Sequence, residues 1–169
     1  MAYKLIILAP SCGGKSTLMR YLREHSNLDI AESDEEVMGA NNDIWPSDHD
    51  LKNKILIPLI TKEIIKSDSV IFFASYIPED SIREARDKGF KVALLDISME
   101  ELIQRNKKRM AQENYQDATP WFAMQLDDYE QLKKSGLIDT KIDGAKNVEK
   151  LSKEIITMAE NFHQSQEGL

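Results

Sequence analysis

Residues 5–17 read "LIILAPSCGGKST", an apolar run that passes into small residues and ends in Gly-Lys-Ser-Thr. A phosphate-binding loop usually has a glycine, four free positions and then Gly-Lys-Ser or Gly-Lys-Thr. Gly14, Lys15 and Ser16 fill the last three positions, whereas Ala9 stands where the first glycine is usual. Because alanine adopts a left-handed conformation only at a cost, we expect Ala9 to have a negative φ.

The residues on either side of this stretch favour a nucleotide site. Residues 3–9 are predicted to form a buried strand and residues 15–25 a helix, so the loop connects a strand to a helix N-terminus. Backbone N–H groups of residues 12–17 could then point at phosphate oxygens, where the helix dipole also favours negative charge. A flexible turn with a helix cap is the alternative, which the order of strand, loop and helix disfavours.

The side chains of the loop indicate how a nucleotide and a metal ion would be held. We expect Lys15 to neutralise the β and γ phosphate oxygens and Ser16 to offer a hydroxyl to Mg²⁺, which takes few protein ligands. The helix terminus could activate the thiol of Cys12, although a tolerated small residue is the favoured interpretation. The expected nucleotide contacts in the loop are Ser11, Cys12, Gly13, Gly14, Lys15, Ser16 and Thr17.

Length and composition bound the possible functions. The 169 residues, 41% apolar and 30% charged, fit a single domain that spans 1–169. The net charge of −7 opposes general attraction to a nucleic-acid backbone or a membrane surface, so any nucleic-acid contact must be a local patch. One cysteine, no signal peptide and no apolar run of transmembrane length together predict a cytoplasmic protein with no membrane partner.

Short apolar runs alternate with longer amphipathic segments along the chain. This alternation predicts an α/β fold of three layers, a parallel sheet of about five strands with helices on both faces and the ligand at the carboxyl ends of the strands. Pro58 is expected to kink or break its helix. The expected strands are 3–9, 28–32, 69–75, 90–96 and 140–144, and the expected helices are 15–25, 50–67, 78–89, 99–110, 120–136 and 148–162.

Other classes of phosphate-loop protein fit less well than a kinase. No Asn-Lys-x-Asp guanine signature occurs, and although "ALLDISMEE" could be the strand and acid of an ATPase, an isolated domain lacks the usual oligomeric machinery. Kinase chemistry predicts a carboxylate that faces the phosphate acceptor and a mobile helix that carries arginine. The sequence offers candidates for both.

The carboxylate candidates lie in "AESDEEVMG", residues 31–39, directly after the second predicted strand. Asp34 could accept the proton of an attacking hydroxyl and help to hold a magnesium-bound water, with Glu32 and Glu35 as rivals. Alternatively, Ser33 caps a helix and forms a capping box with Glu36, which is compatible with a catalytic Asp34.

The arginine candidates lie in "ELIQRNKKRM", residues 101–110. Arg105 and Arg109 are four residues apart, so they share a helical face and could reach phosphate oxygens together, with Lys108 beside them. A solvated basic face is the alternative. The polar loop that follows favours a helical lid over roughly 105–125, in which both arginines are exposed and mobile when the lid is open.

These segments resemble the P-loop kinases of the adenylate-kinase-like group, which includes shikimate, gluconate and polynucleotide kinases. "PSCGGKST", the acid in "ESDEE" and "GFKVALLDISMEELIQRNKKR" are most similar to the kinase domain of phage polynucleotide kinase, and "ESDEEVMG" also resembles shikimate kinases. The resemblance spans nearly the whole chain. It implies ATP and Mg²⁺ as cofactors, Asp34 as the base, Arg109 as the lid arginine, and residues 142–147 with Asn147 as the turn around adenine.

The acceptor side departs from the pattern of these families. The third strand ends in "FFASY" instead of a triple glycine or a Gly-Phe-Pro-Arg-like turn, and Val37 replaces the acceptor-binding arginine expected of a polynucleotide kinase. Ser75 and Tyr76 could face a polar acceptor. Trp45 and Trp121 could stack on a base or sugar, although single aromatics lie more often in a core. His25, His49 and His163 lack metal-ligand spacing and are assigned no role.

We therefore expect an ATP- and Mg²⁺-dependent kinase that phosphorylates a hydroxyl. A nucleic-acid or nucleotide-type acceptor, including a hydroxyl on a modified base, is favoured slightly over a small metabolite of the shikimate or gluconate type. A nucleoside monophosphate kinase is a further alternative. A nucleotide-binding switch or ATPase without an acceptor is the alternative from another class, and the oligomeric state stays open.

Overall fold

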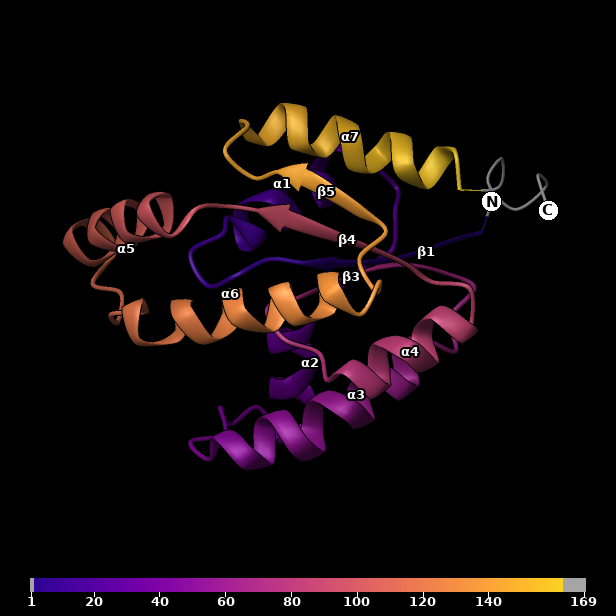
Figure 1. The fold of residues 1–169 in the computed structure, drawn as a ribbon, viewed down its shortest axis with the longest axis horizontal. Helices are drawn as coiled ribbons and strands as arrows, with labels where there is room; N and C mark the ends of the chain where they lie inside the picture. The colour runs from indigo at the N-terminus through magenta and orange to yellow at the C-terminus, as the bar shows by residue number, and fades with distance from the viewer. Residues whose placement is uncertain (1, 163–169) are drawn as a thin grey trace.

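A parallel sheet of five strands forms the centre of the molecule in a computed structural model that describes residues 2–162 (Figure 1). The strand order is β2-β3-β1-β4-β5 and every pairing is parallel, as the sequence predicts. His163 lies outside the described residues. The strands are β1 (Tyr3–Leu8), β2 (Ile30–Glu32), β3 (Ser69–Ala74), β4 (Lys91–Asp96) and β5 (Thr140–Asp143).

Helical segments connect the strands and cover both faces of the sheet (Figure 1). Most of them begin and end within a few residues of the predicted positions. They are α1 (Lys15–His25), α2 (Ser33–Ala40), η1 (Leu51–Leu56), α3 (Ile57–Ile64), α4 (Glu79–Asp87), α5 (Met99–Glu113), α6 (Thr119–Lys134) and α7 (Val148–Glu160).

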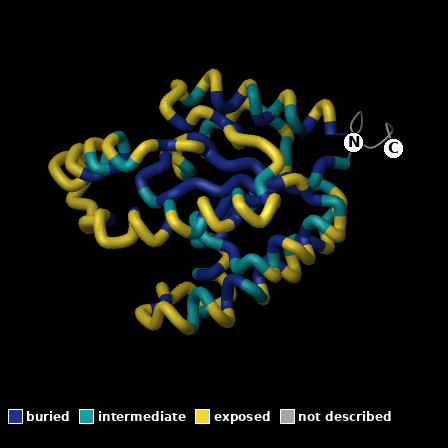
Figure 2. The backbone as a smooth tube through the Cα atoms, in the orientation of Figure 1, coloured by how far each residue is buried: buried dark blue, intermediate teal, exposed yellow. Residues whose placement is uncertain are grey.

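Alternation along β1 divides the core into two layers. Ile6 and Leu8 point to one face of the sheet and pack with residues of α2, α3, α4 and α6. Leu5 and Ile7 point to the other face and pack with α1 and α7. The three central strands, β3, β1 and β4, are buried along most of their length, while the edge strand β5 and the outer helix faces are largely exposed (Figure 2). The three-layer architecture is thus confirmed, and it places the loop after β1 at the middle of the sheet's carboxyl edge.

The segment 50–67, predicted as one helix, contains two helix types. It begins as the π-helix η1, in which the N–H of Ile57 bonds the carbonyl oxygen of Lys52, five residues back. It continues as α3, with Pro58 in the first turn, where a missing N–H is tolerated. Pro58 therefore breaks nothing and marks a change of helix type. Single π turns inside helices are frequent at functional sites.

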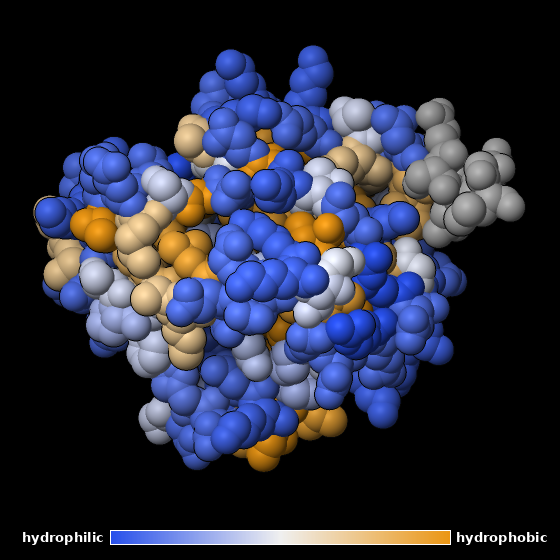
Figure 3. Space-filling model, viewed as in Figure 1, coloured by the Kyte–Doolittle hydropathy of each residue, from blue (hydrophilic) through white to orange (hydrophobic). Residues whose placement is uncertain are grey.

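Large apolar side chains are exposed in only two segments of the described chain. In Figure 3, apolar surface shows at the end of the molecule where α5 and α6 meet and at the edge where α3 lies. None of the helices between residues 2 and 162 has the length and apolar character that crossing a bilayer requires. The exposed large apolar residues are Ile44, Trp45, Ile55, Leu59, Met110, Tyr115, Trp121 and Met124.

One partly buried hydrogen bond joins α6 to the residue after β3. The hydroxyl of Tyr129 donates to the carbonyl oxygen of Ser75 at 2.6 Å, and burial raises the pKa of this phenol strongly. We expect Tyr129→Phe to lower the free energy of unfolding by about 1–2 kcal/mol, because it leaves a partly buried carbonyl without its donor. Urea unfolding measures this change. Tyr115→Phe, on an exposed ring, is the matched control and should change stability by less than about 0.5 kcal/mol; equal effects would contradict the assignment.

Candidate active site

The backbone of the loop after β1 agrees with one sequence prediction and departs from another, and Cys12 has an unexpected φ of 60°. Ala9 is not among the residues with positive φ, as expected, whereas Gly14 has a φ of 87°. The N–H of Gly13 donates to the carbonyl oxygen of Pro10 at 2.8 Å, so it does not point at a ligand as predicted for every N–H of 12–17. A Cβ at position 13 would lie 2.6 Å from that carbonyl oxygen, so only glycine fits.

The N-terminus of α1 leaves several donors for an anion. Leu18 is the first residue whose N–H bonds within this helix, to the carbonyl oxygen of Gly14 at 3.0 Å. The N–H groups of Lys15, Ser16 and Thr17 precede it and have no partner in an α-helix. No acidic residue lies in the first turn, so the helix dipole is uncompensated there. This end of α1 is suited to bind phosphate.

Two buried polar side chains hold the loop against α5 and α6, and sequence analysis missed both. Gln125 accepts from the N–H of Ser11 at 2.9 Å and donates to its hydroxyl at 3.0 Å. Asn106 accepts from the N–H of Ala118 at 3.0 Å and lies 3.8 Å from the Sγ of Cys12. Both side chains stand on the buried faces of their helices, where a polar residue is the signal that could have revealed them.

Asn106 also joins the turn between α5 and α6. Its amide nitrogen donates to Asp117 at 2.7 Å and to Thr119 at 3.0 Å. We expect Asn106→Ala to lower the free energy of unfolding by about 1–3 kcal/mol, because the buried N–H of Ala118 loses its acceptor. Chemical denaturation provides the measurement. Gln104→Ala, exposed on the same helix, is the control, and an Asn106 variant as stable as this control would contradict the role.

The side chains of Lys15 and Glu32 lie close to each other at the start of α1. Their Nζ and Oε1 atoms are 4.0 Å apart and both side chains are largely buried. Glu32 also caps α2, because its carboxylate accepts from the N–H of Glu35 at 2.9 Å. The predicted capping box of Ser33 and Glu36 is therefore wrong: the last residue with extended backbone is Glu32, and Ser33 is already helical.

The environment of Glu32 disfavours its charged form. Burial, followed by the charge of Asp34, raises the pKa of this carboxyl above its ordinary 4.5, and Lys15 opposes the shift only in part. The folded state therefore holds the proton to higher pH than the unfolded chain does. Consequently, the stability that this proton contributes is lost as pH rises from 4.5 through the folded pKa.

We expect Glu32→Gln to remove that loss, since glutamine keeps an oxygen for the N–H of Glu35 but does not titrate. As pH rises from 4.5 toward neutrality, the free energy of unfolding of the variant should increase relative to that of the parent protein. Urea titrations across this range measure the difference. Glu36→Gln, exposed in the same helix, is the control. Parallel stability profiles for Glu32→Gln and the parent would refute the assignment.

The three acids after β2 have different partners. Glu35 forms a bidentate pair with Arg23, at 2.9 and 2.7 Å, and this partner lowers the pKa of its carboxyl. Glu32 is the buried cap of α2. Asp34 is partly exposed, and its Oδ1 is buried without a hydrogen bond, 3.3 Å from the Nζ of Lys52. Of the three carboxylates, Asp34 thus retains the most capacity to accept a new hydrogen bond.

Arg105 and Arg109 lie over the phosphate loop. The Nη2 of Arg105 donates to the carbonyl oxygen of Gly144 at 3.0 Å, and the Nη1 of Arg109 is 4.0 Å from the Sγ of Cys12. Their side chains are 26% and 33% exposed, so both arginines are half-buried in this structure, and their exposure in an open lid stays a prediction. The guanidinium of Arg109 stacks 3.7 Å from the ring centroid of Tyr115, which explains part of this burial. Lys108 is exposed.

The side chain of Asn147 has a structural partner. Its Oδ1 accepts from the N–H of Lys150 at 2.9 Å and so caps α7. Its contact with a nucleotide stays a prediction, which the bond between Arg105 and Gly144 makes geometrically reasonable, since Gly144 belongs to the same turn.

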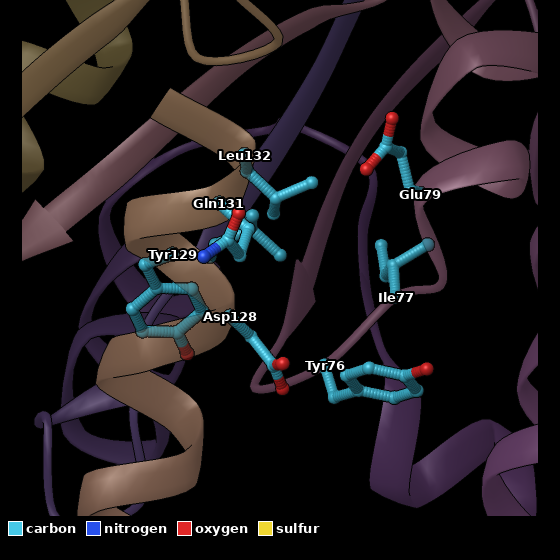
Figure 4. A pocket seen from close by; sticks show the side chains of 8 residues that line it. Tyr76, Ile77, Glu79, Asp128, Tyr129, Gln131 and Leu132 are labelled. Carbon is cyan, nitrogen blue, oxygen red and sulfur yellow. The ribbon is translucent and has the colours of Figure 1, made fainter. Parts of the chain in front are cut away.

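A small cavity of about 190 Å³ opens at the end of β3, between α4 and α6 (Figure 4). Tyr76 lines it, whereas Ser75 is not among the lining residues and its carbonyl oxygen accepts from Tyr129. Whether either residue faces the acceptor stays a prediction. Burial, followed by the charge of Asp127, raises the pKa of the Asp128 carboxyl in this cavity. Leu8, one residue before the phosphate loop, forms part of the wall. The cavity is therefore a candidate for part of the acceptor site.

A second, larger hollow of about 470 Å³ lies apart from these residues, along β5 and α7. Four lysines surround its apolar floor, and one of them, Lys146, forms an ion pair with Glu154. Lys141 lies on β5 itself, an edge strand, where charged side chains are typical. The four are Lys141, Lys146, Lys150 and Lys153.

Both tryptophans lie at the surface, not in the core. Trp45 is 48% exposed and lies against the ammonium of Lys52, 4.6 Å from the ring centroid. Trp121 is 38% exposed and packs on His49, with ring centroids 4.4 Å apart. Sequence analysis assigned His49 no role, and this contact joins the segment before η1 to the start of α6.

Comparison with known proteins supports the fold alone. No protein-family model and no curated protein matches the sequence. Shikimate kinase from Acinetobacter baumannii in complex with shikimate aligns with a TM-score of 0.69 and 16% identity, over 94% of this chain and 93% of that chain. A gluconokinase from Sinorhizobium meliloti 1021 aligns at 0.65 and 15% identity, over 97% of each chain. The fold is that of the P-loop kinases.

A chain of the Pnkp1/Rnl/Hen1 RNA repair complex also aligns with this P-loop kinase fold. Its TM-score is 0.57 and its identity 19%, over 79% of this chain and 46% of that chain. The fold is therefore shared by kinases whose names refer to a small metabolite and by a chain from an RNA repair complex. The fold alone does not distinguish a small-metabolite acceptor from a nucleic-acid acceptor.

Proposed function

We propose that this protein is an ATP-dependent kinase that transfers the γ-phosphate to a hydroxyl of its acceptor. The observation that carries the proposal is the position of Asp34. Its unbonded Oδ1 lies at the carboxyl edge of the sheet, two residues from Glu32, which in turn contacts Lys15 of the phosphate loop. A base, a phosphate-binding lysine and a helix N-terminus are thus adjacent on a P-loop kinase fold.

The residues of the chain would act by position and charge. Asp34 would take the proton of the acceptor hydroxyl, and Lys15 with the N–H groups of α1 would hold the phosphates. Arg105 and Arg109 already lie over the loop, where they could stabilise the charge on the transferring group. Their positions support a lid over roughly 105–125 that covers the site during transfer.

The residues present also fit a magnesium ion. Between residues 2 and 162, no group of three or more His, Cys, Asp or Glu side chains could hold a metal by itself. Mg²⁺ at kinase sites needs few protein ligands, because substrate phosphates and waters supply the rest. The exposed hydroxyl of Ser16 and the unbonded oxygen of Asp34 would serve. Bound with ATP, the ion would neutralise charge on the phosphates.

Two acceptor classes agree with particular features of the structure. A nucleic-acid or nucleotide-type acceptor agrees with the exposed Trp45 beside Asp34 and with the resemblance of the sequence to polynucleotide kinase. A small metabolite of the shikimate or gluconate type agrees with the small size of the cavity at Tyr76 and with the net charge of −7. We favour the first class, and a nucleoside monophosphate kinase is a variant of it.

A labelled-ATP transfer screen tests this proposal. Acceptors should include oligonucleotides, DNA with hydroxylated bases, nucleosides, nucleotides, shikimate and gluconate. We expect Asp34→Asn to reduce transfer by about 10²-fold or more while ATP affinity stays similar, because it removes the base and keeps the shape. Glu35→Gln, which breaks only the pair with Arg23, is the matched control, and Lys15→Ala should abolish transfer.

Several outcomes would count against this assignment. Greater damage from Glu35→Gln than from Asp34→Asn would show that the wrong acid is named. Binding of ATP by the parent protein without transfer to any acceptor would favour a nucleotide-binding switch or an ATPase.

A further inference from the structure

An ordered turn presents Trp45 beside the proposed base. The side-chain amide of Asn41 donates to the carbonyl oxygen of Ile44 at 2.6 Å. The backbone N–H of Asp43 donates to the carbonyl oxygen of Met38 at 2.8 Å. Asn42 and Asp43 have φ values of 54° and 61°, which non-glycine residues seldom adopt. Asparagine and aspartate adopt this conformation more readily than other non-glycine residues, so the sequence suits the turn that holds the exposed ring of Trp45.

Lys52 lies between this ring and the proposed base. Its Nζ is 3.3 Å from the Oδ1 of Asp34 and 4.6 Å from the ring centroid of Trp45, and its side chain is only 17% exposed. Because Asp34 Oδ1 accepts no hydrogen bond in the described chain, this ion pair lacks hydrogen-bond geometry. An ammonium has three donors, so Lys52 has capacity for a further partner.

The contact between His49 and Trp121 also holds the segment between Trp45 and η1. It joins the residues just before η1 to the first turn of α6, within the proposed lid. The exposed apolar side chains of the described chain also gather on these two segments, 44–59 and 110–124. The segment that carries Trp45 is thus held by its own turn and, four residues further on, by the contact between His49 and Trp121.

We propose that Trp45 and Lys52 form an acceptor subsite for a planar ring of the nucleobase type. The inference rests on the proposed kinase function and narrows its substrate. The indole would stack on the face of the ring, and the ammonium would donate to a ring carbonyl or ring nitrogen. A hydroxyl attached to that ring or to its sugar would then meet Asp34. A sugar acid has no flat aromatic face for the indole to cover.

Fluorescence of Trp45 tests the subsite without any need for phosphoryl transfer. The chain has two tryptophans, so Trp121→Phe leaves Trp45 as the only indole and keeps an aromatic ring against His49. Thymidine or 2′-deoxyguanosine should change this fluorescence in a saturable way, whereas 2-deoxyribose, shikimate and gluconate should not. Thymidine and 2-deoxyribose share the sugar and differ in the planar ring, so they form a matched pair of ligands.

Variants then test the two residues separately in the transfer assay. For an acceptor with a base, Trp45→Ala and Lys52→Ala should each raise KM about 10-fold or more, whereas Trp45→Phe should retain most of the affinity. Ile44→Ala is the control, because Ile44 is the exposed neighbour of Trp45 in the same turn. Thymidine, thymidine 5′-monophosphate and single-stranded oligothymidylate distinguish a nucleoside, a nucleotide and a polymer as the source of the ring.

The two assays separate failure of this inference from failure of the kinase assignment. Saturable binding of a nucleoside at Trp45 without transfer to any acceptor would support the subsite and overturn the kinase. Transfer to shikimate or gluconate that Trp45→Ala leaves unchanged would support the kinase and overturn the subsite. Absence of any fluorescence change with both nucleosides would also overturn the subsite, whatever the transfer assay shows.

Discussion

The candidate site depends on the close approach of the backbone at Gly13 to the backbone at Pro10. The chain leaves β1 at Leu8 and must turn back on itself within a few residues to start α1 beneath the same edge of the sheet. The bond from Gly13 to Pro10 makes this turn, and no side chain fits at position 13. Without that turn, the N–H groups at the start of α1 would not gather at the centre of the carboxyl edge.

Buried polar contacts extend this constraint to the lid. Gln125 binds both the N–H and the hydroxyl of Ser11, and Asn106 touches Cys12 while it holds the turn between α5 and α6. A displacement of the loop therefore disturbs hydrogen bonds in two helices at once. Since buried polar groups are costly to leave unpaired, the loop and the lid are expected to move as coupled parts.

The sequence predicted the fold because its signals are local. Apolar runs and helical periodicity depend on residues close together in the chain, and the order of strand, loop and helix placed Lys15 at the start of the helix that follows β1, where the structure has it. Alternation of strands and helices then predicted the parallel sheet and its carboxyl edge. Asp34 was found in the same way, as an acid just after a strand.

The remainder of the candidate site could not be predicted because it depends on contacts between distant residues. Nothing near Lys52 in the chain indicates that it meets Asp34, since the residues between them form the turn that brings the two together. The burial of Arg109 depends on Cys12 and Tyr115, which lie on either side of it in sequence. Asp34 and Glu35 could be distinguished as candidate bases only from the structure, which shows that Glu35 forms an ion pair with Arg23.

The π-helix η1 has a consequence for how this acceptor side can vary. A π turn spans five residues between bonded groups where an α turn spans four, so η1 holds one residue more than a regular helix would. Each residue of an α-helix rotates the chain by about 100°. Deletion of one residue from η1 would therefore swing Lys52 away from both Asp34 and Trp45 while α3 kept its packing. The placement of Lys52 next to Asp34 therefore depends on the length of this one turn, whereas the loop after β1 does not.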